Sequence, residues 1–231
     1  IAHAFAVGVP QPGFLDFGIH VVRHPLAGAC CNFRTLATAI AAATTATALA
    51  FFLSGGFARR FDRFAYARRG FDLGTGLRYF GLTQPSDEPF RGTCLLSHLH
   101  WDHIQCLPFF KPFLRPGANV TLYAPVQPGD ITVGEVFADT IKPPLFPIHF
   151  SMFPGMVDIH EIGDDEFMLG DDVRVMTRLI PHVGHTVGYR VEWNGRSVVY
   201  MSDHQMPTDG SHSAWPGVFE LCNGADLLIH D

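Results

Sequence analysis

A run of metal-ligand side chains, directly after a short apolar segment, constrains this chain more than any other feature. Cys94, Leu95 and Leu96 are typical of a buried strand, and the chain continues Ser97, His98, Leu99, His100, Trp101, Asp102, His103. Histidines one residue apart point the same way from an extended segment, so His98 and His100 can bind one ion together. Asp102 and His103 follow where the sequence becomes helical, and they can turn toward a second ion. The run therefore predicts a two-metal site at the end of a strand.

The non-functional interpretation of this run is that the histidines cluster by chance, because the chain contains 13 histidines among 231 residues. Four ligand-type side chains at this alternation favour a metal site instead, since few other structures need such spacing. Neutral imidazole and carboxylate are good ligands for divalent cations. We expect two ions, with Zn²⁺ first and Mn²⁺ or Fe²⁺ as alternatives.

The length and charge of the chain limit its fold and partners. A chain of 231 residues suits one domain of two packed layers. Charged residues make up only 16% of the sequence and the net charge is -6, so no extended nucleic-acid surface is expected. These features favour a small-molecule substrate, and they leave a homo-oligomer open.

The cysteines indicate the compartment. Five cysteines without a CxxC spacing argue against a disulfide framework and against a cysteine zinc knuckle, so we expect a reducing, cytoplasmic setting. No secretory signal pattern is visible. Because the chain begins at Ile1 and not at Met, we expect a fragment of a longer protein.

Residues 1–70 are atypical of the rest. Residues 36–53 form an uncharged segment that is long enough to span a membrane. The segment is mostly alanine and threonine, however, and these residues favour membrane insertion only weakly. We therefore favour a buried or poorly ordered segment, with no membrane partner. The Arg- and Phe-rich residues 57–69 are compatible with a basic amphipathic helix, and we favour a solvated face.

Residues 71–231 show a readable pattern of elements. A tight turn is expected at 71–76, strands at 94–97 and 120–124, helical turns at 103–107 stopped by Pro108, and a helix capped by Asp130 and ended by Pro143 and Pro144. The aromatic and proline-rich segment 146–154 suits a flap over a pocket or, equally, a loop packed on the core.

The second half of the chain is rich in strands. Residues 173–180 and 225–229 are expected strands, and 188–193 with 196–202 form a hairpin about Asn194 and Gly195, a pair that favours a type I′ turn. The predicted fold class is α/β, with two packed mixed sheets and helices on their outer faces.

Two further segments supply ligands at strand ends. Pro181, His182, Val183, Gly184 and His185 follow one strand, and Ser202, Asp203 and His204 follow another. The two oxygens of Asp203 can bridge two cations, although an aspartate in this position also caps turns. The sequence therefore predicts that metal ligands are spread over several strand ends.

The motif as a whole resembles the metallo-β-lactamase superfamily, whose hallmark His-x-His-x-Asp-His matches His98, His100, Asp102 and His103. The chain is most similar to the branch of ribonuclease Z and small phosphodiesterases. There, a histidine stands six residues before a Gly-Tyr pair, as His182 does before residues 188–189, and the bridging aspartate follows the next strand, as Asp203 does. The turn at 71–76 and the strand at 225–231 also match. The resemblance covers residues 71–231 and implies a single αββα domain.

Two points of the ligand set stay open. The spacing to the Gly-Tyr pair favours His182 as the third ligand, whereas a Gly-His-Thr pattern would select His185. The family's last histidine ligand lies beyond the late strand, so we expect the domain to be incomplete at the C-terminal end. His230 is an alternative for that ligand.

The resemblance implies a di-metal hydrolase that cleaves small or cyclic phosphodiesters by a metal-bridging hydroxide. His98, His100 and His182 would hold the first ion, and Asp102 and His103 the second, with Asp203 between them. Asp102 would also orient the hydroxide, and His204, or else His185, would protonate the leaving alkoxide. The alternatives are a lactone, thioester or β-lactam hydrolase and a non-catalytic, incomplete member of the superfamily.

Overall fold

The computed structural model describes residues 22–23, 68–207, 210 and 213–230, and the chain divides into two compact units. The parallel unit comprises residues 32–162, and the mixed unit comprises β1 (Val22–Arg23) and the residues from 163 onward. The uncharged segment 36–53 and most of the basic segment 57–69 lie outside the described residues. Among the helices that are described, none is long and apolar enough to cross a membrane.

The parallel unit is built on a sheet of four strands in the order β2-β3-β4-β5. Their bounds are β2 Arg69–Phe71, β3 Arg91–Leu95, β4 Asn119–Pro125 and β5 Met156–Ile162, and each neighbouring pair is parallel. Phe71 pairs with Leu95, and Leu95 pairs with Tyr123. Because parallel strands end at the same edge of a sheet, the residues that follow β2 and β3 are brought side by side.

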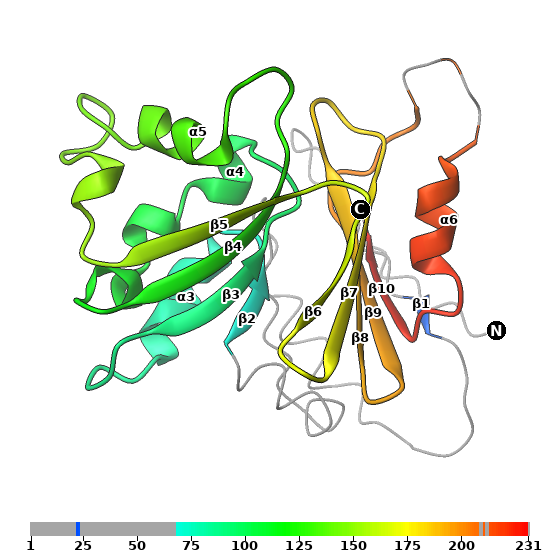
Figure 1. Ribbon diagram of the computed structural model, residues 1–231, viewed down its shortest axis with the longest axis horizontal. Helices are drawn as coiled ribbons and strands as arrows, with labels where there is room; N and C mark the ends of the chain where they lie inside the picture. Colours follow the sequence, from blue (N-terminus) through cyan, green and yellow to red (C-terminus); the bar gives the residue numbers. More distant parts are fainter. Residues whose placement is uncertain (1–21, 24–67, 208–209, 211–212, 231) are drawn as a thin grey trace, which may run out of the picture. The chain divides into compact units, whose positions relative to one another are not determined.

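Helices cover one face of this sheet, namely α3 (Gly76–Thr83), α4 (Trp101–Ile104) and α5 (Val133–Thr140) (Figure 1). The core between helices and sheet contains an aromatic cluster. The rings of Phe90 and Phe110 meet edge to face at 4.8 Å, and Phe80 stacks on Phe110 at 6.0 Å. Leu107, Leu122 and Phe137 are fully buried around them. This packing supplies the rigid support beneath β3.

The mixed unit is a six-stranded sheet in the order β1-β10-β9-β8-β7-β6. The bounds are β6 Glu166–Leu169, β7 Val173–Leu179, β8 Val187–Trp193, β9 Arg196–Met201 and β10 Leu227–His230. β6 to β9 form an antiparallel meander, whereas β9 and β10 are parallel, with Met201 paired to His230. The carboxyl ends of β9 and β10 therefore meet at one edge.

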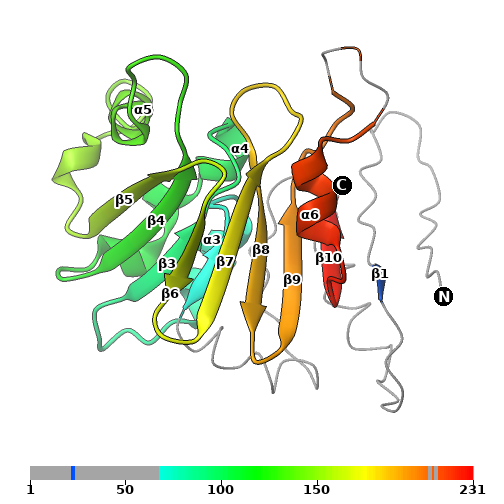
Figure 2. The ribbon, with the colours of Figure 1, turned by 45° about the vertical axis from the view of Figure 1, so that its right-hand side comes forward.

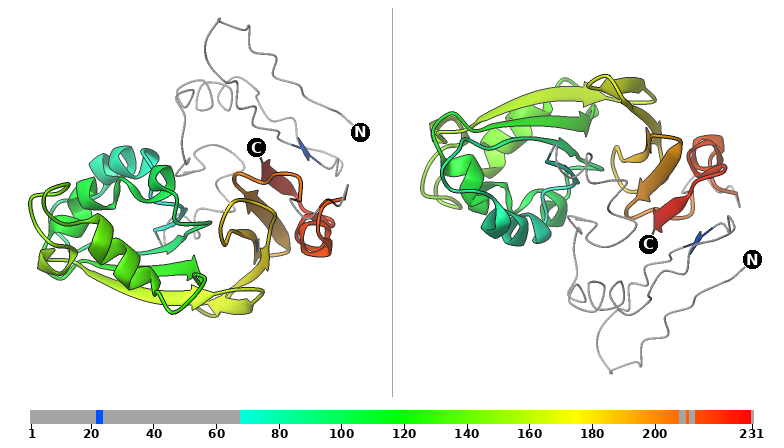
Figure 3. Two further views of the ribbon diagram at one scale, coloured as in Figure 1. Left: turned by 90° about the horizontal axis from the view of Figure 1, so that it is seen from above. Right: turned by 90° about the horizontal axis from the view of Figure 1, so that it is seen from below.

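Helix α6 (Pro216–Cys222) lies along this sheet (Figures 2 and 3). Its buried residues Val218 and Leu221 pack with Ile180, Val199 and Met201. Arg178 of β7 donates two hydrogen bonds to the Glu220 carboxylate, each 2.7 Å long. The helix is thus held by an apolar contact and by a bidentate ion pair.

Several predicted elements are confirmed. The α/β class with two sheets is observed, and β4, β7 and the β8–β9 hairpin lie where the sequence places them. Asn194 and Gly195 have φ values of 49° and 69°, as the type I′ turn requires. One sheet is mixed, and the other is parallel over its described strands.

Other local predictions were wrong. Thr132, not Asp130, caps α5, because Thr132 and Glu135 form a reciprocal capping box. Helix α4 begins at Trp101 and not at residue 103. Pro108 does not stop a helix, because it lies in the first turn of a 3₁₀ helix, Leu107–Phe109, where no N–H is needed for a helical hydrogen bond. The strands β5 and β6 and the helices α3 and α6 were not predicted.

The aromatic segment 146–154 is a loop packed on the core of the parallel unit. It contains a 3₁₀ helix, Phe150–Met152, and the ring of Phe150 stacks on Phe137 at 5.5 Å. Phe153 is buried and contacts Phe113 at 5.6 Å. Of the two interpretations offered for this segment, the packed loop is the one observed.

Candidate metal centre

The ligand run leaves β3 in an extended conformation and enters α4. His100 has φ -64° and ψ 150°, and helical geometry begins at the next residue. The two histidines do point the same way, because Nε2 of His98 lies 2.9 Å from Nδ1 of His100. Their ring centroids are 4.5 Å apart. The alternation predicted from the sequence therefore produces a convergent pair.

The other two members of the motif lie beside this pair. The rings of His98 and His103 are 4.1 Å apart, and Oδ2 of Asp102 is 3.4 Å from Nε2 of His103. Two nitrogens on one tetrahedral zinc ion are about 3.3 Å apart when each bond is about 2.0 Å. The spacing and the chemistry of these donors fit a divalent cation, and all four predicted ligands of the parallel unit are brought together.

A buried carboxylate, Asp72, organises the base of this cluster. Its Oδ1 accepts a 2.6 Å hydrogen bond from the backbone N–H of Ser97, and its Oδ2 lies 3.0 Å from Ser97 Oγ and 2.9 Å from His103 Nδ1. Asp72 directly follows β2 and has a φ of 54°, a left-handed conformation that aspartate tolerates better than most residues. Only 2% of the residue is exposed.

These contacts set which imidazole nitrogen is available for a metal. Nδ1–H of His103 donates to the Asp72 carboxylate, which leaves the Nε2 lone pair as the ligand atom. Ser97 Oγ lies 3.0 Å from Nδ1 of His98 and directs Nε2 of that ring outward in the same way. Carboxylates that orient ligating histidines also raise their basicity. The sequence predicts Asp72 only as part of a turn and predicts no role for Ser97, although both residues follow adjacent strands.

Backbone hydrogen bonds tie the Asp72 turn to α4. The amide of Leu73 donates to the carbonyl of His103 over 2.7 Å, and the amide of Cys106 donates to the carbonyl of Leu73 over 2.9 Å. The amide of Asp72 donates to Leu95 over 3.1 Å. Turn, strand and helix therefore form one hydrogen-bonded frame around the candidate ligands.

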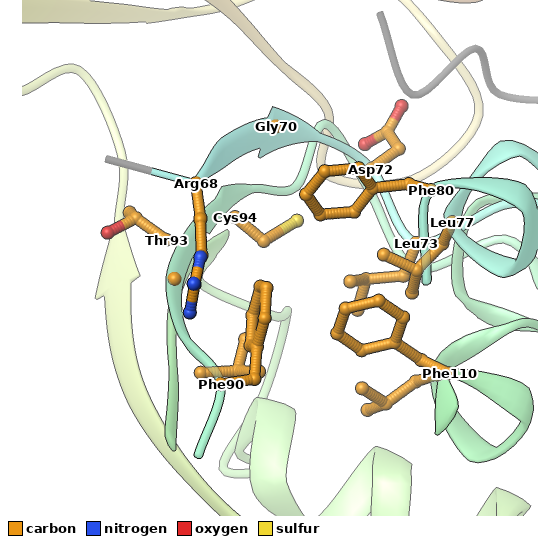
Figure 4. A pocket seen from close by; sticks show the side chains of 13 residues that line it. Arg68, Gly70, Asp72, Leu73, Leu77, Phe80, Phe90, Thr93, Cys94 and Phe110 are labelled. Carbon is orange, nitrogen blue, oxygen red and sulfur yellow. The ribbon is translucent and has the colours of Figure 1, made fainter. Parts of the chain in front are cut away.

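A small cavity of about 30 Å³ lies next to this frame (Figure 4). Its walls are mainly aromatic and aliphatic side chains, among them Phe80, Phe90 and Phe110, and the Asp72 carboxylate points away from their rings. Burial, and secondarily the Asp72 charge, raises the pKa of the Cys94 thiol well above its ordinary value. The cavity is lined mostly by apolar side chains, and Asp72 is the lining residue that it shares with the candidate metal centre.

In the mixed unit, His182 lies in the loop between β7 and β8. The amide of Ile180 donates to the carbonyl of Thr186 over 3.0 Å and closes this loop at its base. His182 is half-buried, whereas His185 is exposed. The loop therefore holds the two alternative ligands in different environments.

Asp203 follows β9 at the same edge of the sheet. It has a φ of 58°, and its Oδ2 accepts a 2.7 Å hydrogen bond from the Ser202 hydroxyl. The amide of Gln205 donates to the carbonyl of Pro181 over 3.0 Å. This bond brings the segment of Asp203 against the loop of His182, so both predicted ligands of the mixed unit lie in joined loops.

His204 pairs with His230, a contact that the sequence did not reveal. Nδ1 of His204 lies 2.9 Å from Nε2 of His230, the last residue of β10. Burial, and secondarily the neighbouring His230, lowers the pKa of His204. The contact follows from the parallel pairing of β9 and β10, which joins residues far apart in the sequence.

Comparison with known proteins agrees with the motif. Residues 82–231 match the model of the beta-lactamase superfamily domain, and the chain belongs to that family, as the His98–His103 motif indicates. No curated protein sequence matches the chain.

Solved structures of low sequence identity resemble the fold. They include a diphosphatase from the PhnP family (20% identity, TM-score 0.48), the metallo-β-lactamase fold protein YhfI from Bacillus subtilis (16%, 0.49) and the short form of human tRNase Z (18%, 0.49). The matches cover 69%, 80% and 69% of this chain, and 54%, 64% and 65% of those chains, respectively. The chain therefore spans less than two thirds of the length of each of these proteins.

Proposed function

We propose that the protein is a metal-dependent hydrolase of small or cyclic phosphodiesters. The observation that carries the proposal is the arrangement of His98, His100 and His103 on a buried Asp72–Ser97 support. Metal-ligating histidines almost always donate their second ring N–H to a carboxylate, a backbone carbonyl or a water, as His103 does to Asp72. The substrate class rests on the resemblance to the branch of ribonuclease Z and small phosphodiesterases.

The proposed ligands come from the run after β3 and from the loops after β7 and β9. His98, His100 and His182 would hold one zinc ion, Asp102 and His103 would hold a second, and Asp203 would be a ligand of both. His182 is preferred to His185 because a half-buried imidazole is partly desolvated already, while His185 is exposed to water. A carboxylate bridge offsets the repulsion between two cations.

The chain's own residues then have distinct roles. Bound divalent ions would supply a hydroxide nucleophile at neutral pH by lowering the pKa of a coordinated water. Asp102 would orient that nucleophile. His204 would return a proton to the leaving-group oxygen through Nε2, which has no hydrogen-bond partner among the described residues.

The test combines metal content with turnover. Metal-loaded protein is assayed on bis(p-nitrophenyl) phosphate, a cyclic nucleotide and a simple lactone, and its zinc is counted by elemental analysis. Two ions per chain with turnover of either phosphodiester supports the proposal. Turnover of the lactone alone favours the alternative of a lactone, thioester or β-lactam hydrolase. Two bound ions without turnover of any of the substrates would contradict the hydrolase assignment.

Variants assign the ligands. We expect His100→Ala to lose both metal and activity, whereas His149→Ala, an exposed histidine of the packed loop, should behave as the unaltered protein. His182→Ala should lose one ion while His185→Ala keeps two. The reverse result would transfer the ligand role to His185.

We also propose a reducing, cytoplasmic compartment. Cys94, Cys106 and Cys222 are free thiols, and burial raises the pKa of each. Export to an oxidising compartment with unchanged activity would contradict this proposal.

A further inference from the structure

The pairing of His204 with His230 is built into the sheet of the mixed unit. β9 and β10 run parallel with Met201 opposite His230, and His204 follows three residues after Met201. The two rings meet at 64°, with centroids 5.1 Å apart and a nitrogen–nitrogen distance of 2.9 Å. A distance of this kind between ring nitrogens is that of a hydrogen bond. His230, the last residue of β10, therefore orients the ring of His204, which lies in the loop after β9.

The other nitrogen of His204 has a different environment. Its Nε2 is buried and has no hydrogen-bond partner among the described residues. Leaving a buried polar atom unsatisfied costs about 1–3 kcal/mol, so native structures usually provide such atoms with a ligand or a water. The ring is held on one side, and its other nitrogen is left for a hydrogen-bond acceptor that the described residues do not supply.

We propose that His230 is a positioning residue that holds His204 as a hydrogen-bond donor to the leaving-group oxygen of the substrate. This inference rests on the proposed phosphodiester hydrolysis. A neutral imidazole has one N–H and one lone pair. When Nε2–H of His230 donates to Nδ1 of His204, the proton of His204 is placed on its Nε2. That is the tautomer that an oxygen acceptor needs.

This role differs from the ligand role considered for His230 in the sequence. In a ligand role, Nε2 of His230 would bind a cation together with His204. Within the described residues of the mixed unit, no further histidine, cysteine or carboxylate joins this pair as a third donor, and structural and catalytic zinc sites use at least three. The pair is therefore complete as a hydrogen bond and incomplete as a metal site.

Kinetics on two substrates test the proposal. An alkoxide is a poor leaving group and depends on a hydrogen-bond donor, whereas p-nitrophenolate leaves readily without one. We expect His230→Leu to lower kcat on a cyclic nucleotide on the order of ten- to a hundredfold, with KM nearly unchanged, and to leave bis(p-nitrophenyl) phosphate within about threefold. His230→Gln, whose amide N–H can replace Nε2–H, should restore most of the loss. His149→Gln serves as the matched control.

A double-mutant cycle distinguishes positioning from general destabilisation. In a His204→Ala background, the change His230→Leu should have no further effect on kcat, because the group that it orients is gone. Equal losses in both backgrounds would overturn the proposal. A drop in bound zinc on His230→Leu would also overturn it and would return His230 to the ligand set.

A readout independent of activity separates this inference from the function it rests on. Long-range ¹H–¹⁵N spectra of the histidine side chains should show His204 as the Nε2–H tautomer in the unaltered protein and in His230→Gln, and as a tautomer mixture in His230→Leu. If the unaltered protein hydrolyses no phosphodiester, the proposed function fails, and a spectrum without the Nε2–H tautomer overturns the positioning role separately.

Discussion

At the scale of single residues, the candidate centre depends on groups that do not themselves bind an ion. Asp72 accepts hydrogen bonds from Ser97 and His103, and Ser97 contacts His98. One carboxylate thereby sets the orientation of two candidate ligands. The function of this side chain is to hold two rings in the tautomer and direction that a cation requires.

Asp72→Asn tests that role. The amide keeps the size of the side chain, but one of its two terminal atoms is a donor and can no longer accept from Nδ1–H of His103. We expect zinc affinity to fall about 10- to 100-fold, measured by competition with a chromogenic chelator. Asp139→Asn, an exposed carboxylate that pairs with Lys142, is the control. Equal affinities of the Asp72 variant and the unaltered protein would contradict the role given to Asp72.

At the scale of elements, α5 depends on its first turn. The Thr132 side chain accepts from the amide of Glu135 over 3.2 Å, and the Glu135 carboxylate accepts from the amide of Thr132 over 2.7 Å. Thr132→Ala removes half of this capping box, so the free energy of unfolding should fall by about 0.5–2 kcal/mol in urea titrations. Thr132→Ser keeps the acceptor and should be nearly neutral. A larger loss in the serine variant than in the alanine variant would refute the capping explanation.

The start of β10 depends on a carboxylate as well. Asp226 accepts hydrogen bonds from Arg196 over 2.6 Å and from the amide of Ser197 over 2.8 Å. Burial by itself raises the pKa of Asp226, but the hydrogen bonds from Arg196 and Ser197 outweigh it and lower the pKa below its ordinary value of 3.8. A carboxyl with a lowered pKa in the folded state stabilises the protein above its unfolded pKa, and this stabilisation is lost as the pH falls.

Asp226→Asn should therefore be pH-dependent in its effect. At pH 7 we expect a loss of about 1–3 kcal/mol in the free energy of unfolding, because a charged hydrogen-bond acceptor is removed. As the pH falls below about 3.9, the ordinary pKa of an unfolded aspartate, the difference from the unaltered protein should begin to shrink, because the unfolded carboxyl takes up a proton first. The difference is lost as the pH falls further, through the lower pKa of the folded carboxyl. Urea unfolding at pH 7, 5 and 3 measures this difference in the free energy of unfolding. A difference that stays constant over this range would argue against the charged contact.

At the scale of the whole molecule, the proposed ligands divide between the two units. Four belong to the parallel unit, and His182 and Asp203 belong to the mixed unit. If both sets bind the same ions, metal should couple the unfolding of the two units. Calorimetry of the metal-free protein should then show two transitions or one broad transition, and the zinc-loaded protein should show a single, sharper one at higher temperature.

Zinc at about 100 times its dissociation constant stabilises the folded state by about 2.7 kcal/mol. The His182→Ala variant, loaded with zinc in the same way, should still show the two transitions or the one broad transition of the metal-free protein. Identical calorimetric traces with and without metal would contradict shared coordination by the two units.

The sequence by itself determined the parts of this protein that depend on local spacing. The alternation of His98 and His100 set the direction of both rings, and the Asn194–Gly195 pair set a tight hairpin, since each depends on the conformation of a few consecutive residues. The cap of α5 was misplaced by two residues because Asp130 and Thr132 are both good caps, and only the reciprocal bond to Glu135 separates them.

Only the tertiary structure decided the contacts between distant segments. Asp72 meets His103 because β2 and β3 are parallel neighbours, and His204 meets His230 because β9 and β10 are. Strand order is fixed by the packing of whole sheets, and no short pattern in the chain records it. The physical reason is that a ligand motif needs only local backbone geometry, whereas the groups that orient its rings come from strands that the fold alone brings together.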